Sequence, residues 1–281
     1  MAGFHQIAGF DVLGTLGTGA KSTLYEVRDK KGQSFCLKRV IKNGPSDQRF
    51  LDQAISEHEL AKNFDHAVLR KSHRLIRQRA LIKTTEVLVL MELIRGKTLE
   101  AQKPPGPAQF CAVLDKVADG LGAMHDAGYV HADLKPNNIM ISTTGEVKVI
   151  DFGQSCAVGT RKERIQGTPD YIAPEQVHRK AITARTDVFN LGATMYWLLT
   201  GNFVPTLIPR GNDAGKLKVE AKRAPKPPAP LEIDSTLPPA LSTLVMSCIE
   251  SDPMDRPATM KQFKDRLAIA ASQVGRAAAS R

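Results

Sequence analysis

The sequence is poor in aromatic residues, in paired cysteines and in long hydrophobic runs. Phe, Trp and Tyr make up 5% of its 281 residues, and Trp occurs once. The four cysteines lie far apart and form no Cys-x-x-Cys, which argues against a metal cluster or disulfide framework and fits a reducing cytoplasm. No apolar run approaches the roughly 20 residues that a membrane-spanning helix needs. We expect no membrane span and, from the first residues, no secretory signal.

The charge balance is basic, with 39 Lys and Arg against 29 Asp and Glu, a net charge of +10. Such an excess can indicate a nucleic-acid partner. Here the basic residues are scattered, aromatic residues are few and no recognition motif accompanies them. We therefore interpret the charge as a solvated basic surface and do not expect nucleic-acid binding. The length allows one large or two small hydrophobic cores.

One stretch in the middle of the chain concentrates reactive side chains. His131, Asp133, Lys135 and Asn138 fall within eight residues, and a second motif, Asp151–Gly153, follows the β-like run Val147–Ile150. Carboxylate and amide oxygens suit magnesium, and a neighbouring lysine suits a phosphate. Either motif alone is common in turns, but the two together in this order and spacing make an ordinary pair of turns an unlikely explanation.

These two motifs resemble the catalytic loop and metal-binding turn of protein kinases. The resemblance implies that Asp133 accepts the proton of the incoming hydroxyl and that Lys135 neutralises charge on the moving phosphoryl group. It further implies that Asn138 and Asp151 hold Mg²⁺, for which Mn²⁺ can substitute, while ATP is the phosphoryl donor. Lys135 matches the Ser/Thr branch of the family.

The segment after the first expected strand, Phe10–Leu16, resembles the glycine-rich loop that covers ATP phosphates. Gly17 and Gly19 are present, whereas Ser22 stands where the family has a third glycine and Leu24 where it has valine. Glycine lets the backbone turn tightly and approach phosphates closely. A plain hairpin turn is the alternative for this segment.

Lys38 lies in a third strand-like run, Ser34–Val40, and the family pattern makes it the ligand of the α- and β-phosphates. Its expected partner is a glutamate on a helix that we predict from Ser46 to about Asn63. Glu57 has the family spacing, and Glu59 is the rival. The two point about 200° apart around a helix, so only one can face Lys38, and we favour Glu57.

The apolar run Val87–Leu93 resembles the last strand before the kinase hinge. By that alignment Met91 guards the back of the adenine pocket, and the backbones of Glu92 and Ile94 bind the adenine edge. A buried strand without a ligand is the alternative.

The segment after Gly153 resembles the kinase activation segment. The resemblance places Thr168 beside the catalytic aspartate and lysine, as part of the protein-substrate platform. Glu175 belongs to the same platform, and its expected ion-pair partner is Arg256. Ala132 replaces the arginine that many family members use to bind a phosphate on this segment. We therefore expect activity that does not strictly depend on phosphorylation of the activation segment, including Thr160.

The resemblance covers residues 10–267 and implies an α+β, bilobal protein-kinase fold. We expect a small, mostly β N-lobe over about 10–93, a hinge at about 92–97, a larger, mostly helical C-lobe over about 98–267 and a basic tail, 268–281. Periodicity and end signals predict helices over four segments. They are Pro107–Gly128, Thr183–Thr200, Pro239–Ile249 and Met260–Ser272. The Lys- and Pro-rich stretch 211–230 is expected to be a surface connection.

We accordingly expect a cytoplasmic Ser/Thr protein kinase that uses Mg-ATP and acts on protein substrates. A regulatory partner chain is compatible with this expectation. A pseudokinase scaffold is one alternative, supported by Ser22. A kinase-fold enzyme acting on a small molecule is another, and Thr168 and Glu175 count against it.

Overall fold

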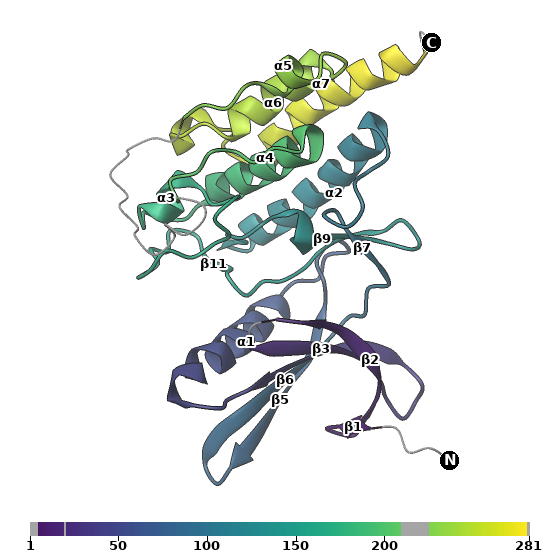
Figure 1. Cartoon of the computed structure of the whole chain (residues 1–281), viewed down its shortest axis with the longest axis vertical. Helices are drawn as coiled ribbons and strands as arrows, with labels where there is room; N and C mark the ends of the chain where they lie inside the picture. Colours follow the sequence, from purple (N-terminus) through teal and green to yellow (C-terminus); the bar gives the residue numbers. More distant parts are fainter. Residues whose placement is uncertain (1–4, 20, 209–224, 280–281) are drawn as a thin grey trace. The chain divides into compact units, whose positions relative to one another are not determined.

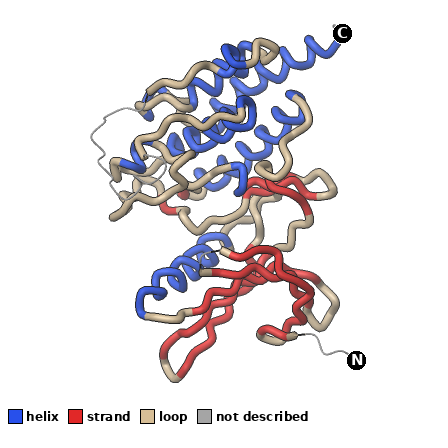
Figure 2. The backbone as a smooth tube through the Cα atoms, viewed as in Figure 1, coloured by secondary structure: helices blue, strands red, loops and turns tan. Residues whose placement is uncertain are grey.

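A computed structural model describes residues 5–19, 21–208 and 225–279, with side chains to Val274. It has two compact units. The first comprises the residues up to Gly96 together with Asp151–Gly153, and the second comprises Lys97–Ile150 together with the residues from Gln154 onward. The first is mostly β-sheet with one long helix and the second is mostly helical, as Figure 2 shows, which agrees with the expected α+β class.

The sheet of the first unit has the strand order β1-β2-β3-β4-β6-β5, and neighbouring strands are antiparallel. A helix, α1, accompanies it (Figure 1). The elements are β1 (Gln6–Ile7), β2 (Phe10–Thr18), β3 (Ser22–Arg28), β4 (Ser34–Ile41), α1 (Gln48–Ala61), β5 (Ser72–Ala80) and β6 (Lys83–Met91).

Strand alternation gives this sheet two apolar faces. Phe35 and Leu37 of β4 pack in one cluster with Leu88 of β6. The intervening residues of β4, including Cys36, pack in a second cluster with Leu51 of α1. Because Lys38 has the same parity as Cys36, its side chain belongs on the face that α1 covers.

The second unit contains longer helices together with several short helices and short strands. They are β7 (Gly96–Thr98), α2 (Pro107–Asp126), β8 (Tyr129–Val130), η2 (Pro136–Asn138), β9 (Ile139–Ser142), β10 (Val147–Val149), β11 (Cys156–Ala157), α3 (Pro174–Val177), α4 (Ala184–Thr200), α5 (Pro230–Ile233), α6 (Pro239–Cys248), η4 (Pro253–Asp255) and α7 (Met260–Ala279). Helix α2 packs on α7, and α6 packs on both α4 and α7. No helix among the described residues is long and apolar enough to cross a membrane.

Helices α4 and α6 approach closely at a glycine. A Cβ atom added to Gly192 would lie 2.5 Å from the Cβ of Cys248, closer than two carbon atoms can pack. This position therefore requires glycine, although glycine weakens a helix interior.

Several element boundaries differ from expectation. Ser46 does not begin α1, because Pro45–Asp47 form a separate 3-10 turn and the helix starts at Gln48. Strand β6 begins earlier and ends earlier than the expected Val87–Leu93. Helix α7 continues beyond its expected end at Ser272. Most of the expected surface connection, 209–224, lies outside the described residues.

Strand β5 was not expected at all. Arg74, Arg77 and Arg79 interrupt its apolar pattern, and its outer residues are exposed. Pairing with β6 forms this strand, since its own sequence lacks the alternation that identifies a half-buried strand.

Candidate active site

The first unit holds an ion pair between the two residues expected to organise ATP phosphates. Lys38 Nζ lies 2.6 Å from Glu57 Oε2, and Glu57 is buried in α1. Desolvation, the largest effect, lowers the pKa of Lys38, but attraction to Glu57 and Asp151 and the hydrogen bond outweigh it, so its pKa is raised. Lys38 is therefore a positive charge at neutral pH. Glu59 instead pairs with Lys62 on the exposed side of α1.

Glu57 has a second cationic neighbour, Arg70, which the sequence analysis did not identify. Arg70 Nη2 lies 3.4 Å from Glu57 Oε1, and both side chains are buried. Each carboxylate oxygen of Glu57 thus faces a different cation. The sequence carries no signal for this role, because Arg70 stands in a segment without periodicity and its burial is known only from the structure.

The Asp151–Gly153 turn is held in the first unit by α1 and the residues after it. Gln53 Nε2 donates to Gly153 O at 3.1 Å, and the Phe152 ring packs edge-on against Phe64. A Cβ atom at Gly153 would meet Gln53 Nε2 at 2.8 Å, so a side chain there would displace the Gln53 amide from its present position. Asp151 has φ 65°, a left-handed conformation that a non-glycine residue adopts at a cost.

The glycine-rich segment forms the turn between β2 and β3. Gly17 pairs with Leu24 across the two strands, and Gly19 N donates to Ser22 O at 2.7 Å. Met91 is buried at the end of β6. The N–H of Glu92 donates to Lys71 O at 2.9 Å. Ile94 follows in the segment between β6 and β7.

In the second unit, Asp133, Lys135 and Thr168 form a compact hydrogen-bonded triad. Asp133 Oδ1 accepts from both the backbone N–H and the hydroxyl of Thr168, each at 2.8 Å. Lys135 Nζ donates to Thr168 Oγ1 at 2.7 Å and lies 3.2 Å from Asp133 Oδ2. The triad joins the catalytic loop to the activation segment and fixes the orientation of the Asp133 carboxylate.

A buried carboxylate holds the backbone of this loop. Asp187, fully buried in α4, accepts from the N–H groups of His131 and Ala132 at 2.9 and 2.8 Å. His125 Nε2 lies 2.8 Å from the same carboxylate. Ala132 has φ 62°, so these hydrogen bonds support a left-handed residue next to Asp133.

Asn138 stands at the end of η2 with its side chain nearly buried. Its Nδ2 donates to Asp133 O at 2.8 Å. The amide nitrogen is thereby committed to the loop, and the amide oxygen is the atom left to bind a ligand. Among the described residues no group of three or more His, Cys, Asp and Glu side chains could hold a metal by itself.

The segment after Gly153 makes backbone and side-chain hydrogen bonds within its own unit. Strand β11 pairs with β8, and Lys162 Nζ donates to Gln154 O at 3.0 Å. Ile182 exchanges backbone hydrogen bonds with the segment, accepting from Gly159 N and donating to Thr160 O. The Thr160 hydroxyl donates to Ala157 O at 2.7 Å.

The expected ion pair between Glu175 and Arg256 is present and fully buried. Both carboxylate oxygens of Glu175 accept from the guanidinium, at 2.8 and 2.9 Å. Thr186 Oγ1 also donates to Glu175, and the Arg256 guanidinium stacks over the Phe189 ring. These contacts join the end of the activation segment to α4 and η4.

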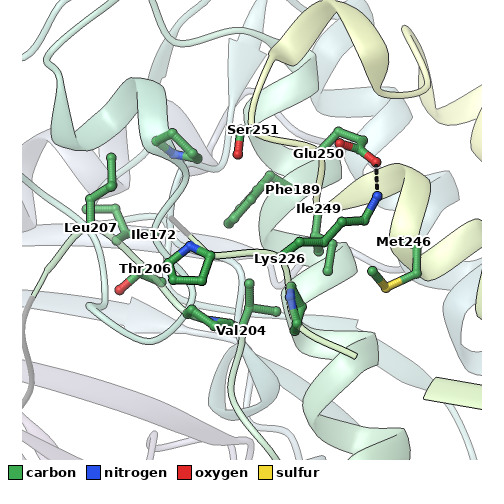
Figure 3. Close-up of a pocket in the computed structure, with 14 residues that line it drawn as sticks. Ile172, Phe189, Val204, Thr206, Leu207, Lys226, Met246, Ile249, Glu250 and Ser251 are labelled. Atoms are coloured by element: carbon green, nitrogen blue, oxygen red, sulfur yellow. Dashed lines mark hydrogen bonds and ion pairs between the residues drawn. The ribbon is translucent and has the colours of Figure 1, made fainter. Parts of the chain in front are cut away.

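A cavity of about 50 Å³ lies in the same unit (Figure 3). Its lining includes Ile172 from the activation segment, Phe189 from α4 and an ion pair between Lys226 and Glu250. A pocket for a nucleotide-sized ligand is several times larger. None of the residues expected to bind ATP lines the cavity, so we do not assign it to the nucleotide.

The expected site residues are therefore divided between the two units. Lys38, Glu57 and Asp151 belong to the first unit. Asp133 and its partners belong to the second. Arg70, Gln53 and Gln176 were not expected as contributors. Gln176 Nε2 donates to Ala132 O at 2.7 Å, which supports the left-handed residue from its other side.

Comparison with known proteins identifies relatives along most of the chain. A family model described as the protein kinase domain matches residues 10–267. The chain is 34% identical over 257 residues to the serine/threonine-protein kinase PknL of Mycobacterium tuberculosis, covering 86% of this chain and 60% of that protein. It is 30% identical over 270 residues to PknA of the same organism, covering 93% of this chain and 60% of PknA. The chain thus spans 60% of the length of both relatives.

Proposed function

This chain belongs to the protein kinase family, and we propose that it transfers the γ-phosphoryl group of Mg-ATP to serine and threonine hydroxyls of protein substrates. The triad of Asp133, Lys135 and Thr168 is the observation that carries this proposal. It presents an oriented carboxylate and an ammonium group side by side, with the activation segment attached to both. Transfer to a hydroxyl requires these two charges at one place.

In the proposed reaction Asp133 orients the substrate hydroxyl and takes its proton. The hydroxyl oxygen forms a bond to the γ-phosphorus, the bond from that phosphorus to the β–γ bridging oxygen breaks, and ADP leaves. Lys135 neutralises charge on the phosphoryl oxygens. General-base assistance contributes roughly 10²–10⁴ in rate, and charge stabilisation is usually the larger effect.

For the nucleotide, we assign phosphate binding to Lys38, oriented by Glu57, and to the turn that contains Gly17, Gly19 and Ser22. Leu24 and Met91 would border the adenine. The backbones of Glu92 and Ile94 would hydrogen-bond the adenine edge. The raised pKa of Lys38 supports its role, because the side chain keeps its charge at neutral pH.

We assign metal binding to Asp151 and Asn138. An aspartate and an amide oxygen are hard ligands of the kind that Mg²⁺ prefers, and Mg²⁺ takes its remaining ligands from phosphates and water. The hydrogen bond from Asn138 Nδ2 to Asp133 O supports this assignment, since it directs the amide oxygen to a ligand. Bound Mg²⁺ would neutralise phosphate charge, and Mn²⁺ is expected to substitute.

We further propose that activity does not strictly require phosphorylation of the activation segment. The Ala132 side chain has no donor for a phosphate, and its backbone N–H already donates to Asp187 Oδ1 at 2.8 Å. The contacts made by Lys162 and Ile182 support the segment without phosphate. Phosphatase-treated chain and the Thr160→Ala variant should both retain most of the activity of untreated chain. Loss of activity in both samples would disprove this independence while leaving the kinase assignment intact.

The proposed partners are proteins that present serine or threonine, together with a regulatory chain, and the proposed location is the cytoplasm, where ATP is available. Substrate proteins should meet the surface of the segment that Thr168 and Glu175 anchor. The burial of Glu175 against Arg256 supports a rigid platform at this position.

The experiment that tests the proposal measures transfer of labelled γ-phosphate from Mg-ATP to the chain itself and to a generic protein substrate. We expect label on serine and threonine that nearly disappears in the Asp133→Asn variant. Asp65→Asn, the same change at an exposed carboxylate, is the matched control and should keep full activity. Undiminished transfer by a folded Asp133→Asn variant would disprove the role of Asp133.

The same assay separates the alternatives. ATP binding without any transferred label would favour a pseudokinase scaffold. Label recovered from a metabolite mixture but not from proteins would favour a small-molecule phosphotransferase.

A further inference from the structure

The hairpin of β5 and β6 carries two large aliphatic side chains at its tip in full contact with solvent. Leu81 is 99% exposed and Ile82 is 88% exposed, the highest values among the large hydrophobic residues that the structure describes. Figure 1 shows this hairpin extending beyond the neighbouring strands of its own sheet. Single exposed aliphatic residues are ordinary, but an adjacent pair at a projecting tip is a candidate interaction site.

The turn itself is unfavourable for these two residues. Ala80 pairs with Lys83, so Leu81 and Ile82 form a two-residue hairpin loop. Leu81 has φ 56°, a left-handed conformation that such loops normally give to glycine or asparagine. The turn therefore carries backbone strain, and neither side chain packs against the fold in return. A strained turn whose side chains gain no packing contact is a reason to infer a function.

Basic side chains line the same hairpin. Arg74, Arg77, Arg79 and Lys83 are all exposed, and among the described residues no ion pair involves any of them. Arg77 acts only at longer range, as a minor influence that lowers the pKa of Glu59 on α1.

The one carboxylate within the two strands does not offset this positive charge. Glu86 is buried and paired with Arg39 of β4. The outer part of the hairpin therefore presents charge of a single sign next to an aliphatic tip.

We propose that the β5–β6 tip, formed by Leu81 and Ile82 with Arg77, Arg79 and Lys83, binds the surface of an anionic lipid bilayer. The two aliphatic side chains would enter the interface between headgroups and acyl chains while the basic side chains contact acidic headgroups. Each basic residue near such a surface strengthens binding about fivefold. This inference does not depend on the proposed catalytic function.

A protein partner fits the tip less well. A stable protein interface buries about 800 Å² on each side and centres on a pocket or a flat patch. A turn of two residues is convex and offers neither, whereas a bilayer needs only a projecting apolar tip. The uniform positive charge also matches an anionic lipid surface better than it matches a patterned protein surface.

The test uses flotation of the purified chain with vesicles of phosphatidylcholine alone or mixed with phosphatidylserine. We expect binding to the anionic vesicles and little binding to the neutral vesicles. We also expect release at high salt, because the screening length falls from about 8 Å at physiological ionic strength to about 3 Å at 1 M salt. The double variant Leu81→Asn, Ile82→Gly should weaken binding at least about tenfold, since both aliphatic groups are lost. Its turn suits the hairpin better, so the variant should fold at least as well.

Charge is tested separately. Arg79→Gln with Lys83→Gln should also weaken vesicle binding, by about 25-fold from two basic residues. The matched control is Lys30→Gln with Lys31→Gln, which removes the same charge from the exposed turn between β3 and β4 and should leave binding nearly unchanged.

Three outcomes would overturn the proposal. One is no binding of the unmodified chain to anionic vesicles, and another is equal binding by the Asn-Gly variant. The third is self-association in sedimentation that the Asn-Gly variant abolishes while vesicle binding is absent, which would identify a second copy of the chain as the occupant. Far-ultraviolet circular dichroism and the thermal unfolding midpoint should be nearly the same in every variant and serve as the folding control.

Discussion

Thr168 contacts Asp133 twice, because its backbone N–H and its hydroxyl both donate to the same carboxylate oxygen at 2.8 Å. The hydroxyl also accepts from Lys135, so one threonine orients both charged groups of the proposed reaction. Replacing the side chain by valine keeps the backbone contact and removes the hydroxyl contact. The two can therefore be separated by mutation.

For Thr168→Val we predict a fall in kcat of about 10- to 100-fold, because Asp133 and Lys135 lose their common partner while the carboxylate itself remains. Thr168→Ser keeps the hydroxyl and should recover most of the activity. Steady-state kinetics with a protein substrate measures both variants. Equal activity of the Val and Ser variants would show that the hydroxyl has no positioning role.

Arg70 should matter for ATP, although it is not expected to touch the nucleotide. Removing it in Arg70→Leu leaves Glu57 Oε1 without a cation, and the pair with Lys38 becomes less well fixed. We predict an increase of about fivefold in the KM for ATP, the equivalent of one ordinary hydrogen bond, with partial recovery in Arg70→Lys.

The control for Arg70 is Arg39→Gln, which removes another ion pair of the first unit, the one between Arg39 and Glu86. It should leave the KM for ATP unchanged. If both variants raise this KM equally, the effect is a general weakening of the first unit, and Arg70 has no specific role.

The buried pair of Glu175 and Arg256 should make a large contribution to the stability of the second unit. Either Glu175→Gln or Arg256→Met leaves one charge buried without its counterpart. We predict a loss of about 3–5 kcal/mol in the free energy of unfolding for the Arg256 variant. The double variant should lose less than the sum of the two single losses. Urea unfolding of all three variants provides the measurement, and strict additivity would contradict the coupling.

We predict that the folded chain loses stability at alkaline pH because of the Cys248 thiol. Complete burial raises its pKa from 9.0 to about 12. The folded state therefore holds the proton more tightly than the unfolded state, so this contribution is complete below pH 9.0 and declines as the pH rises toward 12.

The unfolding free energy of the unmodified chain relative to Cys248→Ala should fall by about 1.4 kcal/mol for each pH unit within that window. Parallel pH profiles for the two proteins would contradict this prediction. As a second readout, Cys248 should resist thiol reagents in the folded chain, because the thiol stays protonated and reagents cannot reach it.

The long helices and several strands follow from sequence, because they depend on short-range patterns. The pairing of Lys38 with a helix glutamate was expected through the family resemblance, and helix geometry then showed that Glu57 and Glu59 cannot both face Lys38. The pairing of Glu175 with Arg256 joins distant segments and was expected only through the family resemblance. The individual roles assigned to the site residues remain predictions.

Arg70 and strand β5 could not be obtained in this way. Arg70 stands in an irregular segment, and its partner is set by how that segment packs on α1. Strand β5 owes its conformation to pairing with β6, and its arginines hide the usual alternation. Ser46 looked like a helix cap because its residue type is right, but Pro45 begins a separate turn at that place.

The buried carboxylate of Asp187 has a consequence for hydrogen exchange. The amides of His131 and Ala132 lie in an irregular loop, where backbone protons normally exchange with solvent quickly. Both are bonded to a fully buried acceptor, and they can exchange only when α4 separates from the loop. These two protons should therefore exchange as slowly as those of the core helices and report directly on the integrity of the catalytic loop.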